Sequence, residues 1–240
     1  TLYSLSDTTV DGNVLEHAFN ARIIREAKCD TSVNQYKESA TRLLNSLIKN
    51  VDDEGKIKIS VINPSVNDYL FCEITANPNE QIAIIDNTIF YEQIFRALKS
   101  DVAKVYYRNR LHSFDFLEMD TLSNNAFFYF LKSIVDFNIL DISIKDKVKN
   151  SLECAHENLN YLYQKDYGKI LKKLYFGEYC KFYELYSVFQ SAEKMFYILK
   201  PLKLDDTNEL INGIINDYYI SNDEKLMEVF KNQLLDKILD

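Results

Sequence analysis

The sequence predicts a mainly α-helical fold that contains a short β-hairpin near its N-terminus and continues as an α-helical array. Three observations support this prediction. Two helical patterns precede a segment that alternates polar and apolar residues around an acidic turn, Asp52–Gly55. The alternation stops at Asn63-Pro64, and every later segment has helical spacing. Glycine (5) and proline (3) are scarce among 240 residues, which favours helix over turn-rich structure.

Two helices are expected before the hairpin, after the end of a first helix at residues 1–6. Asn13 can cap a helix over Val14–Arg25, where apolar residues recur every fourth position. Cap residues then precede an amphipathic helix over Val33–Ile48. Its apolar stripe comprises Val33, Tyr36, Ala40, Leu43, Leu44 and Leu47.

The hairpin is expected over Lys49–Lys58, with a turn at Asp52-Asp53-Glu54-Gly55 in which Gly55 can take a positive φ. Lys56–Ile62 alternates with the period of a half-buried strand. Asn63 then caps a helix that has Pro64 at its first position, where proline loses no hydrogen bond. Ser65 and Asp68 form a second possible capping pair. On this helix Tyr69, Leu70 and Ile74 can share one face.

The rest of the chain reads as helices separated by cap residues and short connections, which predict antiparallel neighbours. Asn77-Pro78 is a break, and the caps are Asp86 or Asn87, Ser100, Ser123, Ser143, Asp205–Thr207 and Ser221. The expected helices are Ile89–Lys99, Val102–His112, Asn124–Phe137, Ile144–Gln164, Glu178–Leu199, Asn208–Tyr219 and Asp223–Leu239. We place a domain boundary between an N-terminal domain, 1–75, and a helical domain, 76–240.

Composition disfavours several classes of function. The net charge of −8 disfavours a general nucleic-acid binder and an anionic membrane surface, because both need clustered lysine and arginine. No run of 18 apolar residues and no signal peptide is present, so we expect no membrane partner and a cytoplasmic protein. The four cysteines, at 29, 72, 154 and 180, lack zinc-ligand spacing and fit reduced thiols.

Motifs for catalysis are absent or incomplete. Gly168-Lys169 is not part of a phosphate-binding P-loop, and the three histidines have no partner at metal-ligand spacing. Arg108 and His112 resemble the Arg-x4-6-His pattern of HEPN ribonucleases, but their spacing is one residue short; a solvated helix end is the alternative. We therefore expect a chain that is not an enzyme, with no catalytic, cofactor-binding or metal-binding residue.

An aromatic-rich region spans residues 161–189. Tyrosine is enriched at interfaces because it buries area and keeps a polar tip, so Tyr179, Tyr183 and Tyr186 are candidates for a partner surface. The alternative is a helical interior that is rich in aromatic residues, in a chain without tryptophan. An exposed tyrosine face on Glu178–Leu199 would favour the partner surface.

The segment Ile59–Leu70 (ISVINPSVNDYL) resembles a signature near the end of the winged helix of STAND NTPases, of which bacterial antiviral-defence proteins are the closest group. Leu2–Asn20 and Thr88–Leu98 resemble the flanking segments, so the likeness covers roughly the first 100 residues. One position departs, because Asn67 stands where the signature has arginine. The signature positions are Asn63, Pro64, Ser65, Asp68, Tyr69, Glu92 and Gln93.

The resemblance implies that residues 1–75 form a winged helix-turn-helix and that the chain is a non-catalytic regulatory and sensor part of a longer ATPase. ATP and Mg²⁺ would bind upstream of Thr1. The winged helix would pack against that nucleotide-binding domain and hold it inactive until the helical part binds a protein trigger, in bacterial relatives often a phage protein. Oligomerisation and effector activation would follow.

Two alternatives remain open. One is a winged-helix DNA-binding regulator with a helical dimerisation domain, in which residues 33–48 would be the recognition helix. The acidic wing residues Asp52, Asp53 and Glu54 disfavour it, because DNA phosphates repel them. The other is a HEPN-like ribonuclease that uses Arg108 and His112.

Overall fold

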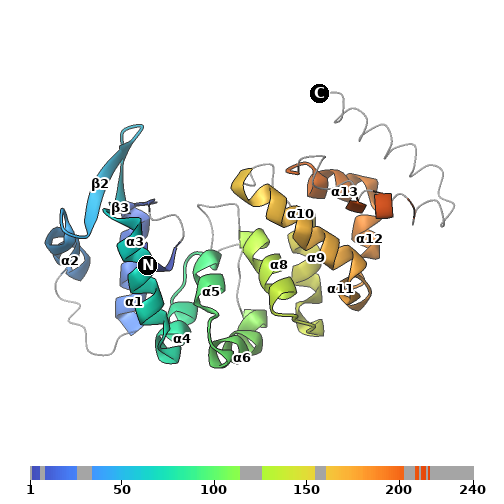
Figure 1. Cartoon of the computed structure of the whole chain (residues 1–240), viewed down its shortest axis with the longest axis horizontal. Helices are drawn as coiled ribbons and strands as arrows, with labels where there is room; N and C mark the ends of the chain where they lie inside the picture. Colours follow the sequence, from blue (N-terminus) through green and yellow to red (C-terminus); the bar gives the residue numbers. More distant parts are fainter. Residues whose placement is uncertain are drawn as a thin grey trace. The chain divides into compact units, whose positions relative to one another are not determined.

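A computed structural model describes residues 2–5, 9–25, 34–113, 126–154, 161–202, 209, 210, 212–214 and 216 (Figure 1). The fold is mainly helical, as the composition predicted. It also contains one small antiparallel sheet of three strands. The chain divides into two compact units, residues 1–110 and 111–240. The first of these units thus includes three helices that lie beyond residue 75. The boundary that we placed at residues 75 and 76 stays a prediction about domains.

The N-terminal unit starts with a short 3-10 helix and a sheet that two helices interrupt. In order these elements are η1 (Leu2–Ser4), β1 (Thr9–Asp11), α1 (Gly12–Arg25), α2 (Gln35–Leu43), β2 (Ile48–Asp53) and β3 (Lys56–Val61). The strand order is β1-β3-β2, with Ile59 of β3 opposite Val10 on one side and Asn50 on the other. Buried Leu5, Val10, Leu15, Ile48 and Ile59 form one core beneath the sheet. The sequence did not predict β1, a strand of only three residues.

The hairpin turns within the predicted segment Asp52–Gly55, through the two residues Glu54 and Gly55. Glu54 and Gly55 both have positive φ values, 53° and 81°, as a type I′ turn requires. The Gly55 N–H donates to Asp52 Oδ1 at 2.9 Å, so the aspartate closes the turn from within. The twist of such a turn matches the right-handed twist of the flanking strands.

Replacing Gly55 by alanine is expected to lower the free energy of unfolding by about 1 kcal/mol, because a side chain is strained at its φ of 81°. Gly12→Ala is the matched control. Gly12 begins α1, and an added Cβ would meet only ordinary contacts, 3.7 Å from Ile57 O, so this change is expected to be neutral or stabilising. Urea denaturation measures both; equal effects would contradict the turn geometry.

Helix α2 is shorter than the predicted helix Val33–Ile48. Asn34 caps it by accepting from Lys37 N at 2.9 Å, but the helix ends at Leu43. Asn45 takes a positive φ of 64°, and Ile48 already begins β2. The predicted C-terminal end of this helix is therefore wrong. Apolar residues keep a helical spacing up to Leu47, although residues 45–47 form a turn. Asn13 is likewise not the cap of α1, since Asp11 Oδ1 accepts from Asn13 N.

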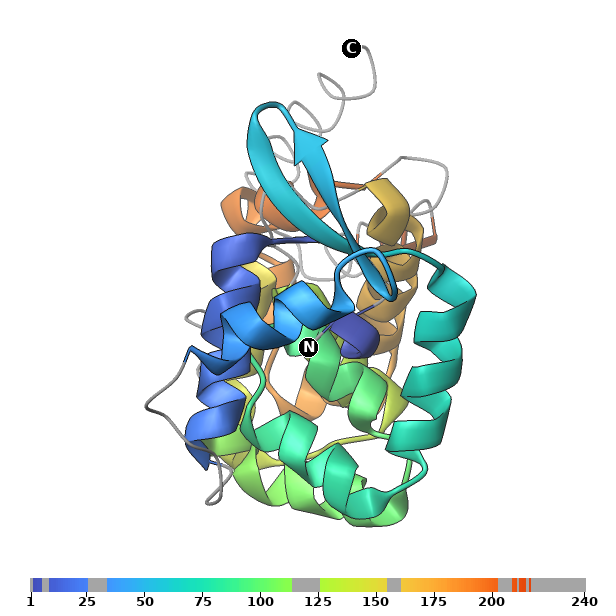
Figure 2. The same ribbon diagram turned by 90° about the vertical axis from the view of Figure 1, so that its left-hand side faces the viewer.

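The unit continues as four helices: α3 (Pro64–Thr75), α4 (Pro78–Asp86), α5 (Tyr91–Ala97) and α6 (Asp101–Arg110). In Figure 2, α1 and α3 stand on opposite sides of η1. The predicted caps of α3 and α6 are confirmed. Asn63 Oδ1 accepts from Ser65 N at 3.0 Å, and Ser100 Oγ accepts from Ala103 N at 3.2 Å. Asn77 caps α4 in the same way as Asn63 caps α3.

One prediction about these helices is wrong. Neither Asp86 nor Asn87 caps α5, because Asp86 ends α4 and Asn87 is the residue after that helix. On α3 the buried residues in the described part of the chain are Asn67, Phe71 and Thr75, whereas Tyr69, which was expected to share a face with Leu70 and Ile74, is 63% exposed. The inward face of α3 thus has a polar residue on either side of Phe71.

The C-terminal unit is all helical in the part of the chain that the structure describes. Its elements are η2 (Leu111–Ser113), α8 (Ala126–Asp136), η3 (Ile142–Ile144), α9 (Lys145–Glu153), α10 (Tyr161–Phe176), α11 (Glu178–Phe182), α12 (Tyr186–Phe189) and α13 (Ala192–Leu199). α10 packs against α8 and α11, and α9 against α13.

Two long predicted helices are wrong in this unit. Ile144–Gln164 is not continuous, because α9 ends at Glu153, and its N-terminal region is capped by Asp141 rather than Ser143. Glu178–Leu199 is three helices, since Glu184 takes a positive φ of 52° while Tyr183 and Leu185 on either side are fully buried. The cap Ser123, the predicted helix Asp223–Leu239 and most of Asn208–Tyr219 lie outside the described residues.

Candidate functional site

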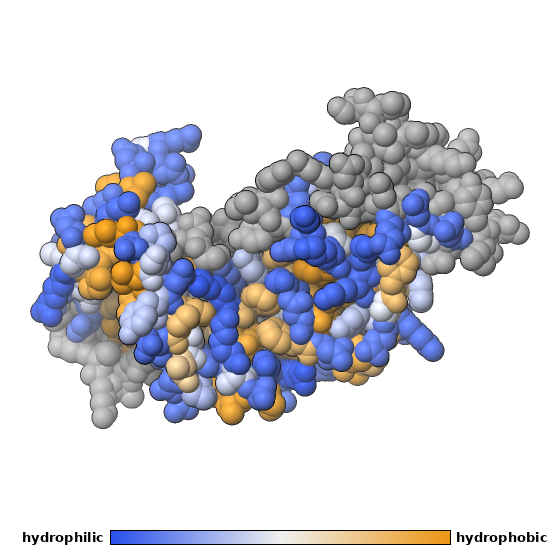
Figure 3. Space-filling view, viewed as in Figure 1, coloured by the Kyte–Doolittle hydropathy of each residue, from blue (hydrophilic) through white to orange (hydrophobic). Residues whose placement is uncertain are grey.

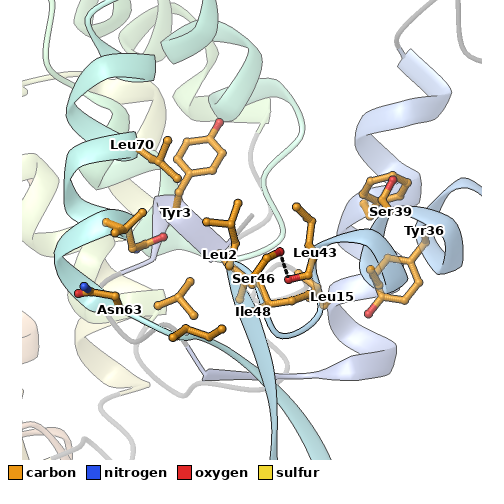
Figure 4. A pocket seen from close by; sticks show the side chains of 17 residues that line it. Leu2, Tyr3, Leu15, Tyr36, Ser39, Leu43, Ser46, Ile48, Asn63 and Leu70 are labelled. Atoms are coloured by element: carbon orange, nitrogen blue, oxygen red, sulfur yellow. Dashed lines mark hydrogen bonds between the residues drawn. The ribbon is translucent and has the colours of Figure 1, made fainter.

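An apolar groove opens on the N-terminal unit, with a volume of about 280 Å³ (Figure 4). Its walls come from η1, α1, α2, the turn that follows α2, both strands of the hairpin and the start of α3. None of the lining side chains in the described part of the chain carries a charge. Its aliphatic members are Leu2, Leu15, Ala40, Leu43, Leu47, Ile48, Val61, Ile62, Val66 and Leu70.

The rim of this groove consists of exposed aliphatic side chains, which the space-filling view shows gathered below the hairpin (Figure 3). Leu43, Leu47, Ile62 and Val66 are 40%, 45%, 41% and 39% exposed. Their position follows from local structure: α2 stops at Leu43, Leu47 lies in the turn, and Ile62 and Val66 flank the Asn63-Pro64 cap. A contiguous exposed apolar surface of this kind is typical of an interaction site.

The sequence did not predict the groove. The stripe assigned to residues 33–48 was expected to be the buried face of one helix, so Leu43, Leu44 and Leu47 were counted as core. Because the helix ends early, all three are exposed instead. The one signal for this outcome in the sequence is Asn45-Ser46, a pair that interrupts the apolar run and favours a turn.

The signature segment forms one wall of the groove. Asn63 lines it and caps α3, Pro64 is the first residue of that helix, and the Ser65 N–H donates to Asn63. Asp68 is largely exposed and lies 3.9 Å from Arg96 Nη2 of α5. Tyr69 points to solvent. The proline-led cap thus has a structural role.

Asn67, which stands in place of the signature arginine, is buried and also lines the groove. Its Nδ2 has no hydrogen-bond partner among the described residues. One turn later on α3, the Phe71 ring lies beneath the Arg96 guanidinium, 4.3 Å from ring centroid to Cζ. The α3–α5 contact therefore depends on an arginine from α5 and an aromatic ring from α3.

Gln93 connects the two segments that resemble the signature's flanks. Its Oε1 accepts from Ile89 N and Phe90 N, each at 3.1 Å, and so caps α5. Its Nε2 donates to Ser4 Oγ at 2.7 Å. Both Gln93 and Ser4 are buried. Glu92, its neighbour in the signature, is partly buried at the start of α5. Gln93 thus joins η1 to α5 within one unit.

The three tyrosines proposed as a partner surface do not share one environment. Tyr179 and Tyr183 are buried in the C-terminal unit, and Tyr186 is 45% exposed. The Tyr179 hydroxyl donates to Asn138 Oδ1 at 2.9 Å. The Tyr183 hydroxyl donates to Ile139 O at 2.9 Å and accepts from Asp141 N at 3.1 Å. Tyr179 and Tyr183 thus belong to the aromatic interior that was the alternative to a partner surface. Both hydroxyls bind the loop that follows α8.

Alkaline pH is expected to destabilise the C-terminal unit through Tyr183. Burial raises the pKa of its hydroxyl from 10.0 to about 12, since the phenolate would lose solvation. The stabilisation is complete below pH 10, where both states are neutral, and is lost as pH rises from 10 to 12, where only the unfolded state ionises readily. Urea midpoints across that range should fall less steeply in Tyr183→Phe than in wild type.

The exposed Tyr197→Phe is the control for this pH dependence, and it should leave the slope unchanged. At neutral pH, Tyr183→Phe itself should cost about 1–3 kcal/mol, because it leaves the Ile139 carbonyl and the Asp141 N–H without their partner. Parallel slopes for wild type and Tyr183→Phe would refute the role of this hydroxyl.

The remaining candidate residues do not converge on a reactive centre in the described ranges. Arg108 lies in the last turn of α6, whereas His112 lies in the 3-10 helix η2, so the two are not one turn apart on a single α-helix as predicted. Both are exposed, and the His112 carbonyl accepts from Lys147 Nζ at 2.8 Å. No cluster of three or more histidine, cysteine or carboxylate residues in these ranges could hold a metal ion. Cys72, Cys154 and Cys180 are free thiols, and Cys29 lies outside the ranges.

The exposed face of α2 carries charges of both signs. Arg42 pairs with Glu38 at 2.5 Å across one helical turn, and Lys37 lies beside them. At the hairpin, a hydrogen bond from Lys58 lowers the pKa of Asp53, so the wing keeps its negative charge. Negatively charged Glu38 and Asp53 thus accompany the positive charges of this surface, whereas a DNA-recognition helix concentrates positive charge.

No helix within the described segments combines the length and the apolar character needed to cross a bilayer. No protein-family model, curated protein or solved structure matches the chain. The groove and its uncharged walls are therefore the features from which a function can be inferred.

Proposed function

We propose that this chain is the regulatory and sensor part of a STAND-type NTPase, in which residues 1–75 form a winged helix that packs against a nucleotide-binding domain upstream of Thr1. The observation that carries the proposal is the uncharged groove with its exposed aliphatic rim, directly beside the signature segment. Exposed aliphatic surface is unfavourable in water, so a protein partner that covers it gains the free energy of its burial.

The order of elements supports the winged helix. A first helical turn, a strand, two helices and a hairpin follow one another, and the hairpin carries the acidic tip that a wing would present. The strand order β1-β3-β2 makes β3 the central strand and β2 an edge strand, with Ile48 and Ile59 buried against α1 and η1. In this proposal Asn63 and Pro64 fix the junction between the wing strand and α3, and Gln93 joins η1 to α5.

In this proposal the helical C-terminal unit couples a protein trigger to the ATPase. A trigger shifts such a switch only by binding the active arrangement more tightly than the inactive one. ATP and Mg²⁺ belong to the upstream domain, and the chain itself performs no reaction. Buried Tyr179 and Tyr183 would give the sensor a rigid interior, and Tyr186 remains a candidate for the trigger surface.

The reading frame upstream of Thr1 tests the proposal first. We expect it to encode a P-loop ATPase within a few hundred codons. That upstream region, produced as a separate polypeptide, should bind the chain of residues 1–240 in isothermal titration calorimetry, more tightly with ADP and Mg²⁺ than without. A start codon next to Thr1, or an upstream region without a P-loop, would end the proposal.

The same preparation tests the two alternatives. A DNA-binding regulator would bind a fluorescein-labelled duplex in anisotropy measurements, with affinity that falls steeply as salt rises. A HEPN-like ribonuclease would cleave RNA, and Arg108→Ala or His112→Ala would abolish the cleavage. We expect neither result, because the wing is acidic and the two residues do not share an α-helix.

A further inference from the structure

We infer that the groove receives a single amphipathic α-helix of the partner, which inserts uncharged aliphatic side chains spaced i, i+3 or i+4. This inference rests on the proposed function only in that the N-terminal unit packs against a protein. It adds the kind of segment that binds and the chemistry of its contact face. Three observations select this occupant.

The first observation is the lack of charge in the groove. Its polar side chains are hydroxyls and amides, from Ser39, Ser46, Asn63 and Asn67 together with two tyrosines, and every other lining residue is apolar. A charged side chain entering the groove would lose its hydration and find no counter-ion. The inserted residues are therefore aliphatic or aromatic, and charges on the partner lie outside the contact face.

The second observation is that backbone groups in the wall of the groove are already hydrogen-bonded. Ile48 pairs with Val61 across the hairpin. Beyond that pair, the Ile62 N–H donates to Leu47 O at 3.0 Å, and the Asn45 N–H donates to Ile48 O at 2.8 Å. An extended peptide gains its affinity by adding to unpaired strand hydrogen-bonding groups. The free outer edge of β2 continues at residues 49–53, none of which lines the groove. The other walls are helical, which suits a helix laid into a groove.

The third observation is the size of the surface. The groove has a volume of about 280 Å³, and its exposed rim consists of four aliphatic side chains. A stable interface between two copies of this chain would bury roughly 800 Å² on each side, far more than these few side chains present. A single helix that contributes two or three side chains fits a groove of this size.

The test uses the whole chain and a phage-displayed library of 15-residue helical peptides. One helical face is randomised, and the other is fixed with glutamate and lysine. We expect enriched peptides to carry aliphatic residues at i and i+3 or i+4. A fluorescein-labelled winner should bind wild type in anisotropy measurements. Leu47→Asp and Val66→Asp should each weaken binding at least tenfold.

Ile57→Asp is the matched control, because Ile57 is an exposed aliphatic residue of β3 that does not line the groove; binding should stay within twofold. Circular dichroism shows that each variant folds, as expected for exposed positions. The inference is overturned if no peptide is enriched, or if winners bind the Leu47→Asp chain as tightly as wild type. It is also overturned if Leu47→Asp weakens the binding of a small apolar dye such as Nile red but not the binding of the peptides. Dimerisation of wild type in sedimentation, lost in Leu47→Asp, would overturn it as well.

Failure of this inference is distinct from failure of the proposed function. If the upstream region binds the chain and Leu47→Asp leaves its affinity unchanged, the helix-in-groove contact is wrong and the regulatory role stands. If groove-dependent peptides are found but the upstream region does not bind, the groove serves a different protein.

Discussion

Gln93→Leu is expected to lower the free energy of unfolding of the N-terminal unit by about 3–5 kcal/mol. The substitution removes the acceptor of two backbone N–H groups at the start of α5 and the donor to Ser4 Oγ, all buried or partly buried. Each polar group left unsatisfied away from water costs about 1–3 kcal/mol. Urea denaturation followed by circular dichroism measures the loss.

Gln93→Glu separates the two functions of this side chain. A carboxylate still accepts from Ile89 N and Phe90 N, and its charge is favoured at a helix N-terminus, so the cap should persist. Ser4 can then donate rather than accept. We expect a loss clearly smaller than that of Gln93→Leu. Asn109→Ala, at an exposed position of α6, should change stability little. A loss below about 1 kcal/mol in Gln93→Leu would show that the network contributes little.

The sequence predicted well those features that neighbouring residues determine. The Asn63-Pro64 cap, the Ser100 cap and the hairpin turn within Asp52–Gly55 each depend on side chains within a few positions of one another. Such local chemistry is readable without tertiary structure, because the cap residue and its backbone partner lie adjacent in the chain.

Features that depend on distant contacts were predicted poorly. The cap of α5 comes from Gln93, whose second partner, Ser4, lies 89 positions earlier. The helical spacing of apolar residues continues through Leu44 and Leu47, and it does not show that Ile48 pairs with Val61 in the hairpin. The groove exists because of that early helix end, so the same error hid the candidate site. In the C-terminal unit, the positive φ of Glu184 between buried Tyr183 and Leu185 interrupts a segment that the sequence predicted as one helix.

Phe71→Ala should destabilise the N-terminal unit by about 3–5 kcal/mol, the usual cost of removing a buried phenylalanine ring. Phe71 is buried on α3 and supports the Arg96 guanidinium, with Lys99 Nζ also above its ring at 5.7 Å. Loss of the ring leaves a cavity and removes a contact that stabilises a largely buried cation, the Arg96 side chain being 16% exposed. Phe71, with Asn67 and Thr75, marks the face of α3 that packs inward.

Tyr69→Ala is the matched comparison, since Tyr69 lies two residues away on the same helix. Periodicity grouped Tyr69 with Leu70 and Ile74 on one face, and the structure leaves Tyr69 63% exposed. We expect this change to alter stability by less than about 1 kcal/mol, as is usual for an exposed side chain. Urea midpoints of the two variants thus decide which face of α3 packs inward. If Tyr69→Ala were the more damaging of the two, the face that carries Tyr69 would pack inward, and Val66 and Asn67 would no longer line one wall of the groove.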